Sequence, residues 1–272
     1  MDLPEQFGPY ELHELVNTGG MADLFLATDE NKQTLAVRRL HKNGTFDFTS
    51  KRRFVRGCEV LSRIHNNEFV IGYIGHGKIN GSHYLAMEYV EGNNLKLLAA
   101  DNDPVLVENI GNVLIESAQA LEHVHDSGFI HLDFKPENIL LSRNAALRLI
   151  DFDLSIPKPE QPVKTRNNPG TPAYMSPEQL LRQPIDQRVD LFAYGVTAFE
   201  LLTGQKPFPG ETAEDIVRQQ LDRSGFKNPR ELNSDIPVAM EKIILKCLEQ
   251  SPEKRYPFTS VLVRDLQAAL YV

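Results

Sequence analysis

Residues 131–140 constrain this chain more than any other stretch. They read His-Leu-Asp-Phe-Lys-Pro-Glu-Asn-Ile-Leu and bring an acid, a base and an amide close together as Asp133, Lys135 and Asn138. Offsets of +2 and +5 from the acid do not share one face of a helix. A loop that carries Pro136 can instead turn all three side chains toward one point. We therefore predict that a loop, and not a helix, carries the functional side chains.

A second acidic segment follows and reads Leu-Arg-Leu-Ile-Asp-Phe-Asp-Leu over residues 147–154. Its apolar start predicts a short strand that ends at Asp151, 18 residues after Asp133. Two carboxylates and the Asn138 amide that converge on one spot form a site for a divalent cation and a phosphate group. The pattern predicts either phosphate transfer or descent from a protein that transferred phosphate.

The spacing and the neighbours of these two segments resemble the catalytic and metal-binding loops of protein kinases. Residues 170–179 read Gly-Thr-Pro-Ala-Tyr-Met-Ser-Pro-Glu-Gln, which is similar to the end of the activation segment in the serine/threonine branch. Asp190 and Arg255 also match kinase positions, where the first braces the catalytic loop and the second pairs with Glu178. Almost the whole chain therefore resembles a bacterial, eukaryotic-like serine/threonine protein kinase domain.

The resemblance implies an α+β, two-lobed protein kinase-like fold. Residues 1–90 would form the N-lobe, a small and mostly antiparallel β-sheet with a Gly-rich loop and one main helix. Residues 91–272 would form the larger, mostly α-helical C-lobe with the catalytic loop, the metal-binding loop and the activation segment. Together the two lobes would make one kinase domain.

The resemblance also assigns chemistry to individual residues. Asp133 would orient a substrate hydroxyl and accept its proton, while Lys135 would offset charge on the γ-phosphoryl group of ATP during transfer. Asn138 and Asp151 would hold two Mg²⁺ ions, or Mn²⁺ ions, that bridge the phosphates.

On the substrate side, the resemblance implies three further contacts. Thr171 would hydrogen-bond to the catalytic Asp and Lys, and Glu178 would form a buried pair with Arg255. Glu137, beside the catalytic lysine, would favour a basic residue in the substrate.

The phosphate cover is implied by a hairpin over residues 16–24, which read Val-Asn-Thr-Gly-Gly-Met-Ala-Asp-Leu. Gly19 and Gly20 lie at its centre, where backbone N–H groups can be laid over phosphates. Asn17 and Ala22 take the outer places, where the family usually has glycine. We expect a stiffer and less permissive phosphate cover.

The adenine pocket is implied by residues 85–95, which are similar to the kinase hinge. The backbone of Glu88 and Val90 would read the adenine edge, with the Met87 side chain beside the back pocket. The positions that match the apolar sandwich around adenine are Val16, Leu24, Ala36, Leu140 and Ile150.

The anchor of the phosphates departs from the family pattern. Arg38 stands where the family has a lysine, and arginine is bulkier and forked. Aligning residues 53–61 with the helix that supplies a bracing glutamate puts Gly57 at the place of that glutamate. Glu59 lies two residues off, roughly 200° around a helix, so it faces elsewhere unless the register shifts. We hypothesise that Arg38 contacts the phosphates without this brace.

Two more departures concern regulation and metal binding. Leu132 replaces the arginine that usually precedes the catalytic Asp and receives an activation-loop phosphate. We therefore predict that phosphorylation of Thr165 or Thr171 does not switch the enzyme on. Asp153 replaces the glycine of the metal-binding triplet, where it stiffens the backbone and adds a negative charge near the metals. Its carboxylate is a candidate ligand for a second Mg²⁺.

Three functions stay open. The first is ATP-dependent phosphoryl transfer to Ser/Thr hydroxyls of protein substrates, and retention of the four phosphate- and metal-handling residues favours it. The second is a pseudokinase that binds nucleotide weakly or not at all and acts as a scaffold or allosteric partner. The third is a kinase-like small-molecule phosphotransferase, which residues 171–178 and Arg255 disfavour because they build a shelf for a peptide substrate.

Composition excludes other classes of protein. The net charge of −8 gives no sign of binding to nucleic acid or to an anionic membrane surface. No apolar stretch approaches the ~20 residues of a membrane span, and the acidic N-terminus does not resemble a signal peptide. Cys58 and Cys247 lie far apart and are predicted to be reduced thiols. We expect a cytoplasmic protein whose partners are ATP and a protein substrate or signalling partner.

Hydrophobic periodicity predicts the elements around these motifs. Strands are expected over residues 10–16, 24–27, 34–40, 69–74 and 84–89. Helices are expected over residues 105–125, 211–222, 236–248 and 257–270, with a long central helix from 186 to a Gly/Pro stop within 201–208. The polar, Pro/Gly-rich residues 158–170 predict an exposed loop.

Overall fold

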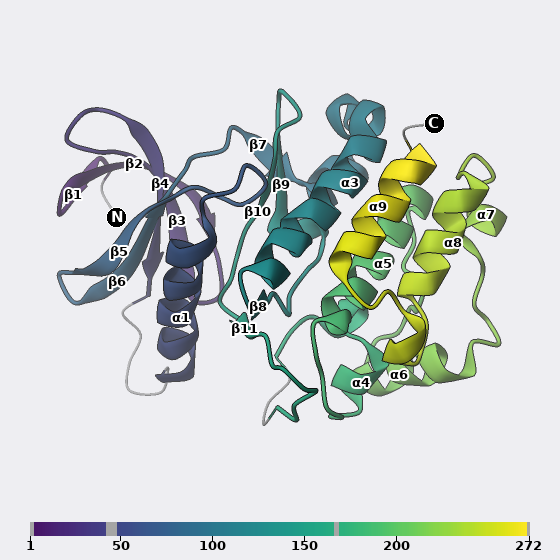
Figure 1. Cartoon of the computed structure of the whole chain (residues 1–272). Coiled ribbons are helices and arrows are strands. Elements are labelled where there is room, and N and C mark those ends of the chain that lie inside the picture. Colours follow the sequence, from purple (N-terminus) through teal and green to yellow (C-terminus); the bar gives the residue numbers. More distant parts are fainter. Residues whose placement is uncertain (1–2, 42–47, 166–168, 271–272) are drawn as a thin grey trace.

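The computed structural model describes residues 3–41, 48–165 and 169–270, and the chain folds into two lobes (Figure 1). In the first lobe, the described residues form a six-stranded antiparallel sheet in the order β1-β2-β3-β4-β6-β5, with one helix beside it. The elements are β1 (Glu5–Phe7), β2 (Tyr10–Thr18), β3 (Ala22–Thr28), β4 (Thr34–Leu40), α1 (Phe48–Ile64), β5 (Tyr73–Ile79) and β6 (Ser82–Met87).

Strand β4 runs through the middle of this sheet and pairs with β3 on one side and β6 on the other. The register sets Arg38 opposite Leu24 and Leu85, and it sets Ala36 opposite Met87. Because side chains alternate along a strand, Arg38 and Ala36 lie on the same face of the sheet. Helix α1 packs near this sheet through an apolar stripe, and its buried residues are Phe54, Gly57, Cys58, Val60, Leu61 and Ile64.

The predicted strand over residues 34–40 is confirmed to the residue, whereas the strand over 69–74 is wrong for most of its length. β5 begins only at Tyr73, because the segment before it turns to the second lobe. There Val70 forms a parallel bridge with Leu149, and the Ile71 N–H donates to the Leu149 carbonyl at 3.1 Å. The apolar character of this segment predicted a strand of the first sheet but did not reveal its partner in the second lobe.

The second lobe is mostly helical (Figure 1). Its helices are α2 (Leu95–Ala100), α3 (Pro104–Asp126), α4 (Pro177–Leu180), α5 (Arg188–Thr203), α6 (Ala213–Asp222), α7 (Pro229–Leu232), α8 (Val238–Cys247) and α9 (Thr259–Leu270). Its short strands are β7 (Gly92–Asn94), β8 (Phe129–Ile130), β9 (Ile139–Ser142), β10 (Leu147–Leu149) and β11 (Ile156–Pro157), and its 3₁₀ turns are η1 (Pro136–Asn138), η2 (Pro172–Tyr174) and η3 (Pro252–Lys254).

Local signals explain both ends of α3 and the end of α5, within a few residues of the prediction. Asp103 caps α3 by accepting a hydrogen bond from the Val105 N–H at 2.8 Å, and Pro104 occupies the first turn. Gly128 follows α3 with φ +83°, a left-handed conformation that glycine adopts without strain. Gly204 ends α5 in the same way, with φ +71°.

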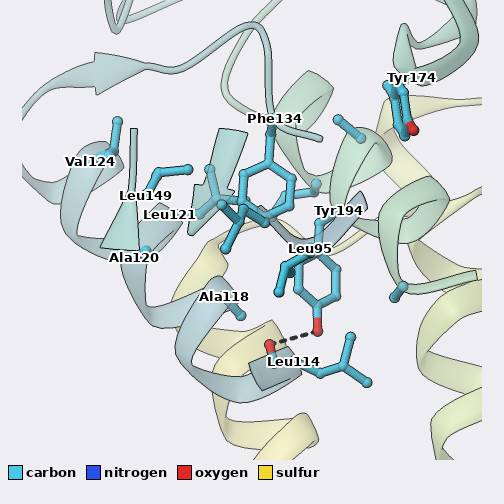
Figure 2. Close-up of a cluster of buried hydrophobic side chains, with 14 of the residues drawn as sticks. Leu95, Leu114, Ala118, Ala120, Leu121, Val124, Phe134, Leu149, Tyr174 and Tyr194 are labelled. Atoms are coloured by element: carbon cyan, nitrogen blue, oxygen red, sulfur yellow. Dashed lines mark hydrogen bonds between the residues drawn. The ribbon is translucent and has the colours of Figure 1, made fainter. Parts of the chain in front are cut away.

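The loop 131–138 is fixed from below by the core of the second lobe (Figure 2). Phe134 is fully buried, and its ring lies 6.1 Å from that of Tyr194 on α5. The Tyr194 hydroxyl donates to the Leu114 carbonyl on α3 at 2.9 Å, so the ring is held by both helices. Leu95 and Leu121 belong to the same buried cluster. Packing of one aromatic side chain thus anchors a polar loop to the hydrophobic core.

A buried ion pair joins two distant parts of the second lobe. Arg255 donates to both carboxylate oxygens of Glu178, at 2.6 and 2.8 Å. The Arg255 side chain is 0% exposed and that of Glu178 is 5% exposed. Arg255 also donates to the carbonyls of Arg188, Glu249 and Gln250, so almost all of its capacity is used. The pair fixes α4, at the end of residues 170–179, against the start of α5 and the segment before α9.

We predict that Arg255→Ala lowers the free energy of unfolding by about 3–5 kcal/mol, because it leaves the Glu178 carboxylate buried without a counter-charge. Urea unfolding followed by circular dichroism measures the change. Arg264→Ala is the control: Arg264 pairs with Asp265 but is 72% exposed, so its loss should cost about 1 kcal/mol or less. Equal losses in the two variants would contradict a special role for the buried pair.

Candidate active site

A cavity of about 130 Å³ lies between the sheet and the second lobe. Several predicted nucleotide positions line it, namely Gly19, Leu24, Arg38, Met87 and Ile150, together with Asp151 and Asp153. Asn17, Ala22 and Gly57 complete that wall at the positions where the sequence departs from the kinase pattern. The structure therefore brings residues from β2, β3, β4, α1 and the segment 150–153 to one place.

Other predicted nucleotide positions do not line this cavity. Val16 is 46% exposed at the end of β2, Gly20 is exposed, and Ala36 is buried beneath the cavity on β4. The Glu88 side chain accepts hydrogen bonds from the Gly72 N–H at 3.0 Å and from Arg148 Nε at 2.9 Å, so it turns away from any ligand. Val90 and Leu140 are partly buried beyond the cavity wall. The Glu88 backbone N–H donates to the Gly72 carbonyl at 2.8 Å, so of this residue only the backbone carbonyl is left for recognition of a ligand.

The acid, base and amide of the first motif meet as the spacing predicts, and Thr171 joins them. Asp133 Oδ2 lies 2.8 Å from Lys135 Nζ, and Lys135 Nζ donates to Thr171 Oγ1 at 2.8 Å. Asn138 Nδ2 donates to the Asp133 carbonyl at 2.8 Å and to Asp133 Oδ2 at 2.9 Å. Thr171 Oγ1 lies 3.4 Å from Asp133 Oδ1. The four side chains form one hydrogen-bonded network.

The backbone of this loop is held by Asp190 at the start of α5. Asp190 accepts hydrogen bonds from the N–H groups of His131 at 2.7 Å and Leu132 at 2.9 Å. His125 Nε2 contacts the same carboxylate at 2.8 Å. Burial alone would raise the pKa of Asp190, but the bond from His125 and the charges and N–H groups around it hold the pKa below its ordinary value. Leu132 has φ +66°, a strained value that these bonds maintain.

Asp151 lines the cavity and also has a positive φ, of +63°. His131 links the two loops, since its Nε2 lies 3.1 Å from the Ile150 carbonyl and its ring lies 5.1 Å from that of Phe152. Burial would raise the pKa of Asp151, but the Arg38 charge and the Asp153 N–H hold it below its ordinary value. The positive charge of Arg38 therefore favours the ionised form of the Asp151 carboxylate.

Arg38 contacts both acids of the second motif. Its Nη2 lies 2.8 Å from Asp153 Oδ2, and its Nη1 lies 3.5 Å from Asp151 Oδ1. Glu59 is exposed on α1, as its angle around the helix predicts, and makes no contact with Arg38. Burial and the neighbouring Asp151 raise the pKa of Asp153 to about 6, while Arg38 opposes the shift. Sequence reasoning linked Arg38 with Gly57 but treated Asp153 as a separate departure, and it missed that all three residues meet.

The donor set fits a magnesium ion. Asn138 uses its Nδ2 on Asp133, which leaves its Oδ1 for a cation, and the Asp151 side chain keeps 33% of its surface exposed. Among the described residues, no group of three or more His, Cys, Asp and Glu side chains has the arrangement of a closed metal centre. One carboxylate and one amide suit Mg²⁺, which usually completes its shell with water and phosphate oxygens.

A second and larger cavity, of about 510 Å³, lies between α1 and the segment after Asp151. Arg52, Arg53 and Arg56 line it from α1, and Leu132 and Thr165 line it from the other side. Burial and the two neighbouring arginines lower the pKa of Arg56. Sequence reasoning missed this cluster, although two arginines one turn apart on one helix were visible as a signal.

The sequence profile described as the protein kinase domain matches residues 10–266. This chain belongs to the protein kinase family. It is 32% identical over 261 residues to a probable serine/threonine-protein kinase of Clostridium acetobutylicum, covering 94% of this chain and 39% of that protein. It is 31% identical over 278 residues to a probable serine/threonine-protein kinase of Streptomyces coelicolor, covering 99% of this chain and 41% of that protein.

Serine/threonine-protein kinase PrkC of Bacillus subtilis is 30% identical over 264 residues, which are 96% of this chain and 40% of PrkC. The kinase domain thus spans about two fifths of the length of the curated relatives that it matches. No helix in the described part of the chain is both long enough and apolar enough to cross a membrane. The two-lobed kinase fold implied by the sequence is confirmed.

We predict that Asp190→Asn lowers the free energy of unfolding of the kinase domain by about 1–3 kcal/mol, because one buried N–H of the loop loses its acceptor. Hydrogen exchange of the backbone should speed up at residues 131–132 in particular. Asp126→Asn, an exposed change at the end of α3, is the matched control and should alter neither quantity. Unchanged exchange at 131–132 in Asp190→Asn would contradict the bracing role.

Proposed function

We propose that this domain transfers the γ-phosphoryl group of ATP to a serine or threonine hydroxyl of a protein substrate. The observation that carries the proposal is the hydrogen-bonded network of Asp133, Lys135, Asn138 and Thr171, together with Asp151, which lines the cavity between the lobes. Phosphoryl transfer depends mainly on positioning and on stabilisation of charge, and this arrangement supplies both. The names of the bacterial relatives support the same activity.

In this proposal, Asp133 receives the substrate hydroxyl and accepts its proton as the oxygen attacks phosphorus. Lys135, which lies 2.8 Å from Asp133 Oδ2, places its positive charge beside the phosphoryl group in transfer. Thr171 holds the lysine and closes the network from the activation segment. Asn138 Oδ1 and Asp151 would hold Mg²⁺, which supplies charge neutralisation for the phosphates when it is bound.

The adenine would lie under β3 and β4 and over the floor made by Leu140 and Ile150. We propose that the backbone at Glu88 and Val90 pairs with its edge, just after β6 ends at Met87. Residues 1–90 then form the lobe that covers the nucleotide, and residues 91–272 form the lobe that carries the transfer chemistry.

A basic residue in the protein substrate would meet Glu137. The Glu137 Oε2 atom is buried and has no hydrogen-bond partner among the described residues. A buried carboxylate oxygen without a partner is costly, so an arriving arginine or lysine would find an acceptor that is already desolvated. We propose that this acceptor favours substrates with a basic residue near the phosphorylated hydroxyl.

A pseudokinase remains the second candidate function, and one observation favours it. The cavity of about 130 Å³ is smaller than the ~300–1,000 Å³ of most ligand sites, and Arg38 is already paired with two carboxylates. A domain of this kind would bind Mg-ATP weakly or not at all and would act through a partner.

We predict that the purified chain labels itself or a basic peptide with γ-³²P from ATP in the presence of Mg²⁺ or Mn²⁺. Asp133→Asn should reduce the rate about 10²–10⁴-fold, because it removes the proton acceptor, while Mg-ATP binding persists. Binding is measured by isothermal titration calorimetry. A thermal shift with Mg-ATP but equal absence of label in both proteins would favour the pseudokinase.

We further propose that phosphorylation of the activation segment does not switch the activity, because Leu132 cannot receive a phosphate. We predict that Thr165→Ala and phosphatase treatment each change kcat less than about threefold, a margin equal to about 0.7 kcal/mol. Arg52, Arg53 and Arg56 line the same cavity as Thr165. They are the cationic side chains that would bind a phosphate on Thr165 if the proposal were wrong. Loss of activity in Thr165→Ala, repeated in Arg56→Ala, would contradict the proposal and show that α1 reads the phosphate.

A further inference from the structure

Gly57 lies where α1 comes closest to the segment 151–153. A Cβ atom at this position would lie 2.3 Å from Asp153 Oδ1 and 2.9 Å from the Asp153 backbone N and Cα. No real side chain fits at such distances, and a backbone cannot move aside as the end of a flexible side chain can. Glycine inside a helix costs about 1 kcal/mol relative to alanine. Glycine at position 57 therefore lowers the stability of helix α1 but leaves space for the Asp153 carboxylate.

The Asp153 carboxylate that Gly57 leaves room for forms an ion pair with Arg38. The Asp153 side chain is 6% exposed, and its Oδ2 contacts Arg38 Nη2 at 2.8 Å. The guanidinium also lies over the Phe54 ring of α1, with 5.3 Å from Cζ to the ring centroid. Its other terminal nitrogen faces Asp151. A forked guanidinium can contact two carboxylates and an aromatic ring at the same time, whereas a lysine has a single nitrogen with which to do so.

We propose that Asp153 positions Arg38 in place of the glutamate that α1 lacks. Arginine at 38, glycine at 57 and aspartate at 153 then act as one unit, in which the acid comes from the metal-binding loop and the helix supplies only space. The role of Arg38 toward phosphate rests on the proposed function, while the ion pair belongs to the fold.

This arrangement changes what controls the active site. Where a helix supplies the acid, a movement of that helix breaks the pair and switches the enzyme off. Here the acid of the pair, Asp153, lies on the same loop as Asp151, the proposed metal ligand, and is two residues away from it. A movement of α1 therefore does not carry the acid itself away from Arg38, although Phe54 of this helix packs against Arg38 and Gly57 lies beside Asp153.

Exchange of the acid between its two possible places tests the proposal. Asp153→Gly removes the carboxylate, Gly57→Glu adds one on α1 against the occupied space, and the double variant moves the acid from the loop to the helix. Glu59→Gly removes an exposed carboxylate from the same helix and is the matched control. Affinity for ATP is measured by calorimetry in EDTA and again in Mg²⁺, and urea midpoints report folding of every variant.

In EDTA we expect each single variant to bind ATP at least about tenfold more weakly, because each one releases Arg38 from its charge-assisted hydrogen bond. The double variant should return to within about threefold of the wild type, and Glu59→Gly should not change affinity. A double variant no better than Asp153→Gly would overturn the proposal. Wild-type affinity for Asp153→Gly in EDTA, with a loss confined to Mg²⁺, would overturn it in favour of a metal ligand.

If the wild type itself does not bind ATP, the proposed function fails and the ion pair is judged by folding alone. The proposal then requires that the urea midpoint of the double variant lies above those of both single variants. If the decrease in the urea midpoint of the double variant equals the sum of the decreases in the two single variants, the proposal is overturned. A carboxylate at residue 57 would then not replace the one lost at residue 153.

Discussion

Arg38 forms an ion-pair cluster that joins the two lobes of this domain. It stands on β4 in the middle of the sheet, and both of its carboxylate partners belong to the loop of the helical lobe. Its side chain is only 19% exposed, and removal of Asp153 would leave this largely buried guanidinium with only the longer contact to Asp151, at 3.5 Å. The cavity that we assign to nucleotide is formed around this contact. Its shape and its charge therefore depend on a single ion-pair cluster.

In the second lobe, too, buried charges connect distant parts of the chain. Asp190 holds the backbone of the loop that carries Asp133, and Arg255 holds Glu178 at the end of the activation segment. In each case a buried charge satisfies backbone groups or an opposite charge that water cannot reach. Buried pairs of this kind are weak sources of net stability, but they penalise every other arrangement of the loop. Functional loops without regular structure are thereby fixed in one conformation.

Much of this could be predicted from the sequence because the signals were local. The strand at residues 34–40, helix α3 between Asp103 and Gly128, and the meeting of Asp133, Lys135 and Asn138 all follow from periodicity, capping and spacing. The Asp153–Gly57 contact could not be predicted, since it depends on the distance between a helix and a loop almost a hundred residues apart. The arginine cluster of α1 was visible, but its cavity depends on the path of the activation segment.

The most direct measurement is a crystal structure with a non-hydrolysable ATP analogue and Mn²⁺, in which anomalous scattering locates the metal. Our account predicts that Arg38 keeps its contact with Asp153 while it approaches a phosphate, and that Mn²⁺ lies against Asn138 Oδ1 and Asp151. A structure in which the Asp153 carboxylate ligates Mn²⁺ and Arg38 has left it would contradict the account.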